Sequence, residues 1–336
     1  MAIRQLLGEE ALTAAGATVA TVNQVNAAVG NRFSAIRGYG SAAPAPAAGY
    51  GDSLNRIWFN GFGTFHKQRD VNNLRGYDYN SGGLVLGYDR EVAALPGLTL
   101  GLNGAWSRGK LKNNDGLAKT DVDTFSLGAY GSYNFSNGLF FDLSFTYGWG
   151  DNETEVNHIL GYLTRGDFDS QSFSASLNAG YKINLTDNVR LTPSLGLQYT
   201  HLKQDGWRER VISDPSTIGL AVGNWFGDVK ADMLEIPVNL ALEATINAGT
   251  VIVTPEFRIG GVFVADKPKN ALTMGFLGAP GSMTIYGIDT VKSRFKGGAG
   301  VKVQFNDLVD LSANYDIEAA SHYTAHSGFI GLGFSF

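Results

Sequence analysis

The end of the chain alternates strictly between two kinds of side chain, and the final residue is aromatic. Ile330, Leu332, Phe334 and Phe336 are separated by single small residues. A period of two is that of a β-strand, whose successive side chains point to opposite faces of the sheet. The same period recurs at 139–149, 173–183 and 191–200. The pattern predicts an all-β fold whose strands have one apolar and one small or polar face.

Aromatic residues near the predicted strand ends indicate which face meets which solvent. They are Tyr88, Trp106, Phe135, Tyr147, Trp149, Tyr181, Tyr199 and Phe305. In a transmembrane barrel the apolar face meets lipid, the polar face meets the lumen, and aromatic girdles mark the interfaces. Mean hydropathy is −0.06, because the two faces cancel. The chain contains no apolar run of the ~18 residues that a transmembrane helix needs. We therefore predict a sheet that closes on itself within a membrane.

The number of strand-like segments predicts a twelve-stranded antiparallel barrel. The segments are 54–67, 79–91, 96–108, 120–135, 139–151, 168–184, 188–205, 228–246, 250–265, 288–304, 308–317 and 324–336. Short turns alternate with long polar loops, among them 206–227 and 266–287. Outer-membrane barrels have short periplasmic turns and longer external loops. An even number of strands would place both ends of the barrel on the periplasmic side.

The N-terminal region differs from the rest of the chain. Apolar residues recur at Val22, Val25, Val29, Phe33 and Ile36, a spacing of three or four that predicts a helix within 1–37. Small residues and prolines at 38–53 predict a linker, which leaves 54–336 as the barrel. About 30 helical residues would span ~45 Å, enough to cross the lumen of such a barrel. A periplasmic coiled-coil piece and a disordered remnant remain the alternatives.

Composition excludes several other functions. A net charge of −5 without a basic face argues against a nucleic-acid partner. The chain has no cysteine, and its five histidines are scattered without metal-ligand spacing, so we expect no metal, cofactor or catalytic residue. A barrel hydrolase would need a serine beside a histidine, such as Ser172 or Ser174 with His201, but no local motif supports that pair.

Several motifs resemble the C-terminal translocator domain of type V autotransporters. The opening Trp58-Phe59-Asn60-Gly61 strand is similar to the first strand of that family. Leu86-Gly87-Tyr88-Asp89 and Leu98-Thr99-Leu100-Gly101 resemble its second and third strands. Leu191-Thr192-Pro193 and Thr254-Pro255-Glu256 resemble two later strands marked by proline. The order and spacing of these motifs cover nearly the whole chain.

The resemblance implies a function in secretion. The barrel would insert into the outer membrane, among lipid and lipopolysaccharide, with the help of the barrel assembly machinery. It would let its own N-terminal passenger cross as a hairpin, and the connecting helix would stay in the lumen. A signal peptide and the passenger are then expected upstream of this chain, and we expect a monomer. The alternatives are a passive pore and the barrel hydrolase.

The resemblance also implies functions for residues of the helix and of the barrel. Family members that cut themselves do so beside paired asparagines in the helix, whereas Asn23 and Asn26 are separated here. The end of the chain, Ile330, Leu332, Phe334 and Phe336, resembles the signal that the assembly machinery binds.

Charges on the lumen side of the strands are the remaining candidates for a site. Alternation turns Glu235, Asn239, Glu243, Glu256 and Arg258 inward, where Arg32 and Arg37 of the helix are candidate partners. The alternative is that these residues only line a water-filled lumen and make no specific contact with the helix.

Overall fold

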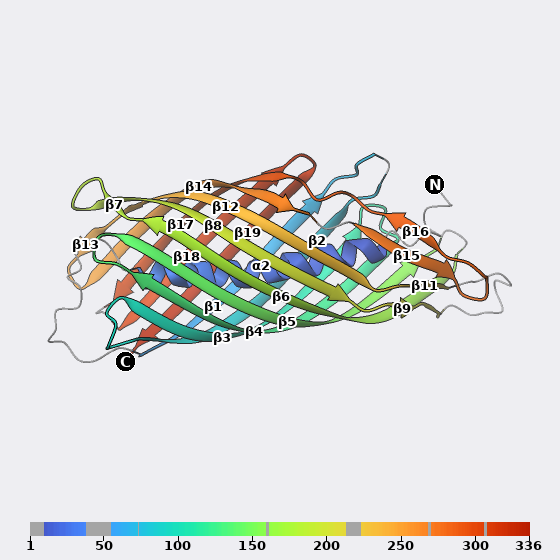
Figure 1. The fold of residues 1–336 in the computed structure, drawn as a ribbon, viewed down its shortest axis with the longest axis horizontal. Coiled ribbons are helices and arrows are strands. Elements are labelled where there is room, and N and C mark those ends of the chain that lie inside the picture. The colour runs from blue at the N-terminus through green and yellow to red at the C-terminus, as the bar shows by residue number, and fades with distance from the viewer. Residues whose placement is uncertain are drawn as a thin grey trace.

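The computed structural model describes residues 10–37, 55–72, 74–158, 161–212, 223–267, 270–305 and 308–336. It is an antiparallel barrel of twelve strands around one helix, α2 (Glu10–Ile36), as Figure 1 shows. The barrel strands are β1 (Asn55–Gln68), β2 (Tyr77–Glu91), β3 (Leu98–Asn113), β4 (Ala118–Asn134), β5 (Leu139–Asn157), β6 (Leu163–Tyr181), β8 (Val189–Gln204), β12 (Val229–Ala244), β14 (Val251–Asp266), β17 (Ser293–Phe305), β18 (Val309–Ala320) and β19 (Tyr323–Ser335). The predicted fold class is confirmed.

The first and last strands close the sheet. β1 pairs with β19 along its whole length, with Phe62 opposite Phe329. At the end of this ladder the Asn55 N–H donates to the carbonyl of Phe336 (3.3 Å), and the Phe336 N–H donates to that of Asn55 (2.9 Å). Closure leaves the backbone of both strands paired on both sides, as a sheet in lipid requires.

The two faces of the sheet are inverted relative to those of a soluble protein. In β5, Phe141, Leu143 and Phe145 are exposed on the outside, whereas Asp142 and Ser144 are buried inside. The stacked rings of Phe125 and Trp149 belong to the outer aromatic residues. The apolar exterior and polar interior are those that a membrane barrel needs.

The long loops contain more structure than the sequence predicts. Four short strands, β9 (Trp207–Arg208), β11 (Asn224–Phe226), β15 (Ala271–Phe276) and β16 (Met283–Tyr286), form a second sheet in the predicted loops 206–227 and 266–287. We call it the cap sheet, and it lies at the right-hand end of the barrel in Figure 1. Trp207, Leu272 and Ile285 pack with Leu12 of α2, which gives these loops a small apolar core.

Several strand boundaries also differ from the predicted ones. β3 and β5 extend to Asn113 and Asn157, and β10 (Arg210–Val211) pairs with β6 beyond the predicted rim. β17 begins at Ser293 rather than at 288. At the opposite end, β7 (Ile183–Asn184) and β13 (Ile246–Ala248) lengthen two of the hairpins. The predicted linker 38–53 lies outside the described residues.

The helix runs along the inside of the barrel, from the cap sheet to the end that holds the short turns (Figure 1). We call these two ends the loop end and the turn end. Val25, Val29 and Phe33 of α2 pack against Trp58, Val85 and Tyr130 of the wall, among other residues. Within the described part of the chain, no helix is long and apolar enough to span a membrane.

Candidate functional site

Arg32 of α2 forms the most buried ion pair between the helix and the wall. Its Nε lies 2.7 Å from Oδ2 of Asp89, and its Nη2 lies 3.0 Å from Oδ1, so the pair is bidentate. Both side chains are nearly inaccessible. The Tyr130 hydroxyl donates to Asp89 (2.8 Å), and the Trp58 indole donates to that hydroxyl (2.6 Å). Arginine, aspartate, tyrosine and tryptophan thus form one network, which we call the Arg32 network.

A second group of contacts holds the end of the helix at the turn end. The guanidinium of Arg37 pairs with the carboxylate of Asp142 and lies 4.3 Å above the ring of Phe140. The Ser132 hydroxyl donates to Asp142 (2.8 Å), and the Lys182 ammonium donates to the Arg37 carbonyl (2.9 Å). The cation is thus fixed by an ion pair and by an aromatic face.

Three polar residues of α2 bind the wall between its two ends. Asn26 donates to Ser174 (2.9 Å) and accepts from Thr146 (3.1 Å). Asn23 accepts from Gln198 (2.7 Å). The hydroxyl of Thr21 lies 2.6 Å from that of Tyr79.

The predicted residues Glu243 and Glu256 lie together beside a lysine that the sequence analysis did not single out. Lys302 lies 3.1 Å from Glu243 and 3.0 Å from Glu256, and it donates to the hydroxyl of Ser34 on α2 (2.6 Å). Its inward position follows from the alternation in β17.

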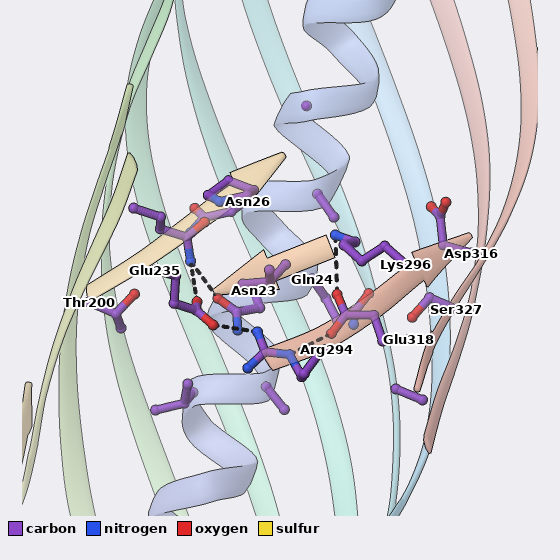
Figure 2. A pocket seen from close by; sticks show the side chains of 18 of the residues that line it. Asn23, Gln24, Asn26, Thr200, Glu235, Arg294, Lys296, Asp316, Glu318 and Ser327 are labelled. Atoms are coloured by element: carbon purple, nitrogen blue, oxygen red, sulfur yellow. Dashed lines mark hydrogen bonds and ion pairs between the residues drawn. The ribbon is translucent and has the colours of Figure 1, made fainter. Parts of the chain in front are cut away.

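The other predicted wall residues form ion pairs within the wall. Arg258 binds Glu256 (2.8 Å) and Asp316 (2.9 Å). Glu235 pairs with Arg294, which also binds Glu318 (3.1 Å). Figure 2 shows Glu235, Arg294 and Glu318 beside Asn23 and Gln24 of the helix. Asn239 lines the same space. Arg32 and Arg37 therefore pair with Asp89 and Asp142 rather than with the predicted glutamates, and Arg32 also lies 3.9 Å from Asp310.

The lumen retains a cavity of about 490 Å³ beside the helix. Its wall includes Glu235, Arg258 and Arg294, and its other side is formed by residues of α2 such as Asn23 and Gly30. The cavity therefore lies between the helix and the charged strands.

The geometry separates the serine and histidine that the hydrolase alternative would pair. Ser172 and Ser174 are buried on the lumen side, whereas His201 is half-exposed on the outside and binds Asp232 (2.8 Å). His201 lies opposite Phe173 in the ladder, so its ring and the two serines are on different faces of the sheet. Among the described residues, no group of three or more histidine, aspartate or glutamate side chains is arranged to hold a metal ion.

Comparison with known families decides the identity of the barrel. The model of the autotransporter β-domain family matches residues 57–316. The chain belongs to this family. Outer membrane protein B of Rickettsia japonica is 26% identical over 338 residues, which cover 93% of this chain and 20% of that protein. Outer membrane protein A of Rickettsia rickettsii is 24% identical, covering 85% of this chain and 13% of that protein.

Solved autotransporter domains share the fold. The translocator domain of NalP from Neisseria meningitidis has a TM-score of 0.69 and 16% identity, covering 94% of this chain and 98% of that one. The transport unit of AIDA-I from Escherichia coli has a TM-score of 0.60 and 14% identity, covering 91% and 98%. The chain is thus an outer-membrane translocator domain, as predicted, and a transport barrel. The passive pore is not favoured. The chain spans at most about a fifth of the length of the relatives named above.

Proposed function

We propose that this autotransporter β-domain exports a passenger fused upstream of α2 and then keeps α2 in its lumen as a plug. The observation that carries the proposal is the direction of the docked helix. Leu12 packs beneath the cap sheet at the loop end, and Arg37 is bound at the turn end. A chain that continues upstream of Glu10 would therefore leave the barrel at the loop end, which faces the cell exterior in this class of barrel.

The plug contacts are the second part of the proposal. We assign the main docking role to Arg32 with Asp89 and to Arg37 with Asp142. Ser34 gives a third contact through Lys302, which Glu243 and Glu256 hold in place. Glu235, Asn239 and Arg258 would act indirectly, as part of the polar, hydrated wall that faces the helix. A buried charge that loses its partner is strongly destabilising, so the two arginines favour one depth of insertion.

The proposed partners follow from the outer surface and from the last strand. Ile330, Leu332, Phe334 and Phe336 point outward along β19, where a receptor of the assembly machinery could bind them before β19 pairs with β1. The apolar belt fits outer-membrane lipid and lipopolysaccharide. Because the sheet closes within one chain, the domain would work as a monomer.

We further propose that the helix is not cut by the paired-asparagine route. Asn23 and Asn26 are three residues apart, and the side chains of both are bound to the wall. An amide held in this way is poorly placed to attack its own backbone. Mass spectrometry of the chain recovered from outer membranes should find the bond after Asn23 and the bond after Asn26 intact.

A surface-display experiment tests the export function. A small reporter domain would be placed between a secretory signal and residue 1, and intact Gram-negative cells would be treated with protease. We expect the reporter to be cleaved in intact cells. A matched chain that lacks residues 323–336 cannot close β1 on β19 and should leave its reporter protected. Protection of the reporter in cells that contain the folded full barrel would contradict the proposed function.

A further inference from the structure

The outer face of β3–β6 contains a hollow on the loop-end side of the apolar belt. It has a volume of about 480 Å³. Its apolar part is formed by Trp106, Phe125 and Trp149, which project outward from three neighbouring strands and are each about half-exposed. The rings of Phe125 and Trp149 are stacked, with their centroids 6.1 Å apart. Aromatic residues at this level of a membrane barrel lie beside the lipid head groups.

Three carboxylates stand in a row at the rim of this hollow. In the strand ladders Asp123 lies opposite Asp151, and Asp151 lies opposite Asp169. All three line the hollow and are at least partly exposed on the outer face. We call them the aspartate row. Side chains directly opposite one another in a sheet have Cβ atoms about 4.5–5.5 Å apart, and like charges in such positions destabilise the sheet.

The aspartate row is poorly neutralised by the protein itself. Arg108 lies 3.7 Å from Asp123, but among the described residues the carboxylates of Asp151 and Asp169 have no ion-pair partner. In the next row toward the loop end, each carboxylate is paired with a basic residue: Asp121 with Lys110, Glu153 with Arg165, and Asp167 with Arg210. Two negative charges therefore remain unbalanced at the hollow, which favours a positively charged ligand.

The chemistry of the hollow favours an organic ammonium group over a metal ion. A cation such as Ca²⁺ needs about six to eight oxygen ligands that converge on one point. In the part of the chain that the structure describes, no three acidic or histidine side chains are arranged in this way. An ammonium group needs less, because a carboxylate and the face of an aromatic ring within ~6 Å are enough to hold it. Asp151 and Trp149 offer both, two residues apart on the outer face of β5.

We propose that this hollow binds the ammonium head group of a membrane lipid. The ammonium group lies between Asp151 and Asp169 and against the ring of Trp149. The acyl chains continue along the apolar surface of the same strands, where Leu127 and Phe145 are exposed. A lipid is the occupant because the hollow opens on the outer, lipid-facing side of the sheet and not on the lumen. This inference goes beyond the export function and does not depend on it.

Native mass spectrometry of the full chain, released from an uncharged detergent, tests the inference. The probe is a short-chain phosphatidylethanolamine, and the matched ligand is the same lipid with an N-acetylated amine, which has no positive charge. We expect saturable binding of the first lipid. The N-acetylated lipid should bind at least about tenfold more weakly, because it forms neither the ion pair nor the cation–π contact.

Variants of the hollow locate the binding. Asp151→Asn with Asp169→Asn keeps the shape of the row and relieves its repulsion, so the barrel should still fold. Its affinity for phosphatidylethanolamine should fall about tenfold, because the ammonium group loses both carboxylates. Trp149→Leu should weaken binding as well, since it keeps the apolar surface and removes the ring. Asp232→Asn is the control, because this outer carboxylate is already bound by Tyr199 and His201.

Three results would overturn the inference. The first is equal binding of the two lipids, and the second is unchanged affinity in the double aspartate variant. The third is displacement of the lipid by Mg²⁺ from the unmodified chain but not from the double variant, which would assign the aspartate row to an inorganic cation. None of these results depends on display of a reporter, so the lipid site and the export function can fail separately.

Discussion

Asp89 carries more of the helix–wall interaction than any other single carboxylate of the lumen. It is fully buried, accepts from Arg32 at two oxygens and from Tyr130 at one, and lies near the end of β2. Removing it leaves the guanidinium of Arg32 buried without its main partner. The loss of one partner from a buried pair costs about 3–5 kcal/mol.

We therefore expect Asp89→Ala to free the second half of α2 while the barrel stays closed. Hydrogen exchange of the amides near Arg32 should accelerate strongly, and the amides of β2 and β3 should stay protected. The double variant Arg32→Met with Asp89→Ala should recover part of the protection. Asp123→Ala, which removes an exposed carboxylate near Arg108, is the control. Unchanged exchange in Asp89→Ala would show that the Arg32 network does not hold the helix.

Glu209 gives the cap sheet a dependence on pH. It lies beyond the lipid-facing zone, beside strand ends whose outer faces carry Arg165 and Asp167. Burial raises the pKa of Glu209 from 4.5 to about 7, although the Asn224 N–H donates to it. The folded protein thus holds this proton more tightly than the unfolded chain does. The resulting stabilisation is complete below pH 4.5 and is lost as pH rises through about 7.

We expect the amides of β11 to open more readily at pH 8 than at pH 6.5, after correction for intrinsic exchange. Burial lowers the pKa of the neighbouring His158 to about 4, an opposite effect confined to pH values below 6.5. Glu209→Gln should remove the difference between pH 6.5 and 8. The same difference in Glu209→Gln would assign the effect to another group.

For single residues, the sequence predicts which side chains point into the lumen better than it predicts their binding partners. The period of two turns Glu235, Glu243, Glu256 and Arg258 inward, and all four line the lumen. The partners of Arg32 and Arg37 could not be predicted from the sequence. The stagger between neighbouring strands sets how deep in the barrel Asp89 and Asp142 lie, and this depth decides which helix residues they contact. Alternation specifies the face of a strand but not its height in the barrel.

The cap sheet is the element that links the external loops to the helix. Trp207 stacks on Phe168 at 4.2 Å and packs on Phe226 at 4.5 Å between ring centroids, and the same cluster includes Leu12 of α2. This cluster joins two loops that are far apart in the sequence to the start of the helix.

Trp207→Ala should loosen the cap sheet and the first turns of α2 together. Truncation of a buried tryptophan costs about 3–5 kcal/mol, which exceeds the stability expected of so small a sheet. Limited proteolysis of the barrel in detergent should then cut within 206–227 or 266–287 while the barrel strands stay intact. Trp149→Ala, on the outer face, is the matched control. Equal resistance of Trp207→Ala and the unmodified chain would mean that the cap sheet is held elsewhere.

The barrel strands could be predicted as elements, and the cap strands could not. Strands of twelve or more residues repeat the alternation often enough to be recognised, as β5 does from Leu139 to Asn157. β9 and β11 have two and three residues, too few to establish a period. β11 also pairs with β15, from a different loop, so no hairpin signal joins them.

At the scale of the whole molecule, closure of the barrel and filling of its lumen are two separate properties of the chain. The ring of strands closes through β1 and β19, and its lumen is then shared by α2 and the cavity of about 490 Å³ beside it. Alternation and strand number predict the ring from the sequence. The off-centre seat of the helix depends on the balance between its apolar face and the large side chains of β1–β5, which no local pattern specifies.

Cross-linking of surface-exposed molecules tests the central claim most directly. Asn26 binds Ser174 on β6, whereas Ser312 lies on β18, across the lumen. In cells that display the reporter, a short bifunctional thiol reagent should link Asn26→Cys to Ser174→Cys in those molecules from which external protease has removed the reporter. Asn26→Cys with Ser312→Cys should link poorly. A cleaved reporter without the first link, or equal linking of both pairs, would contradict a translocator that ends export with α2 docked against β6.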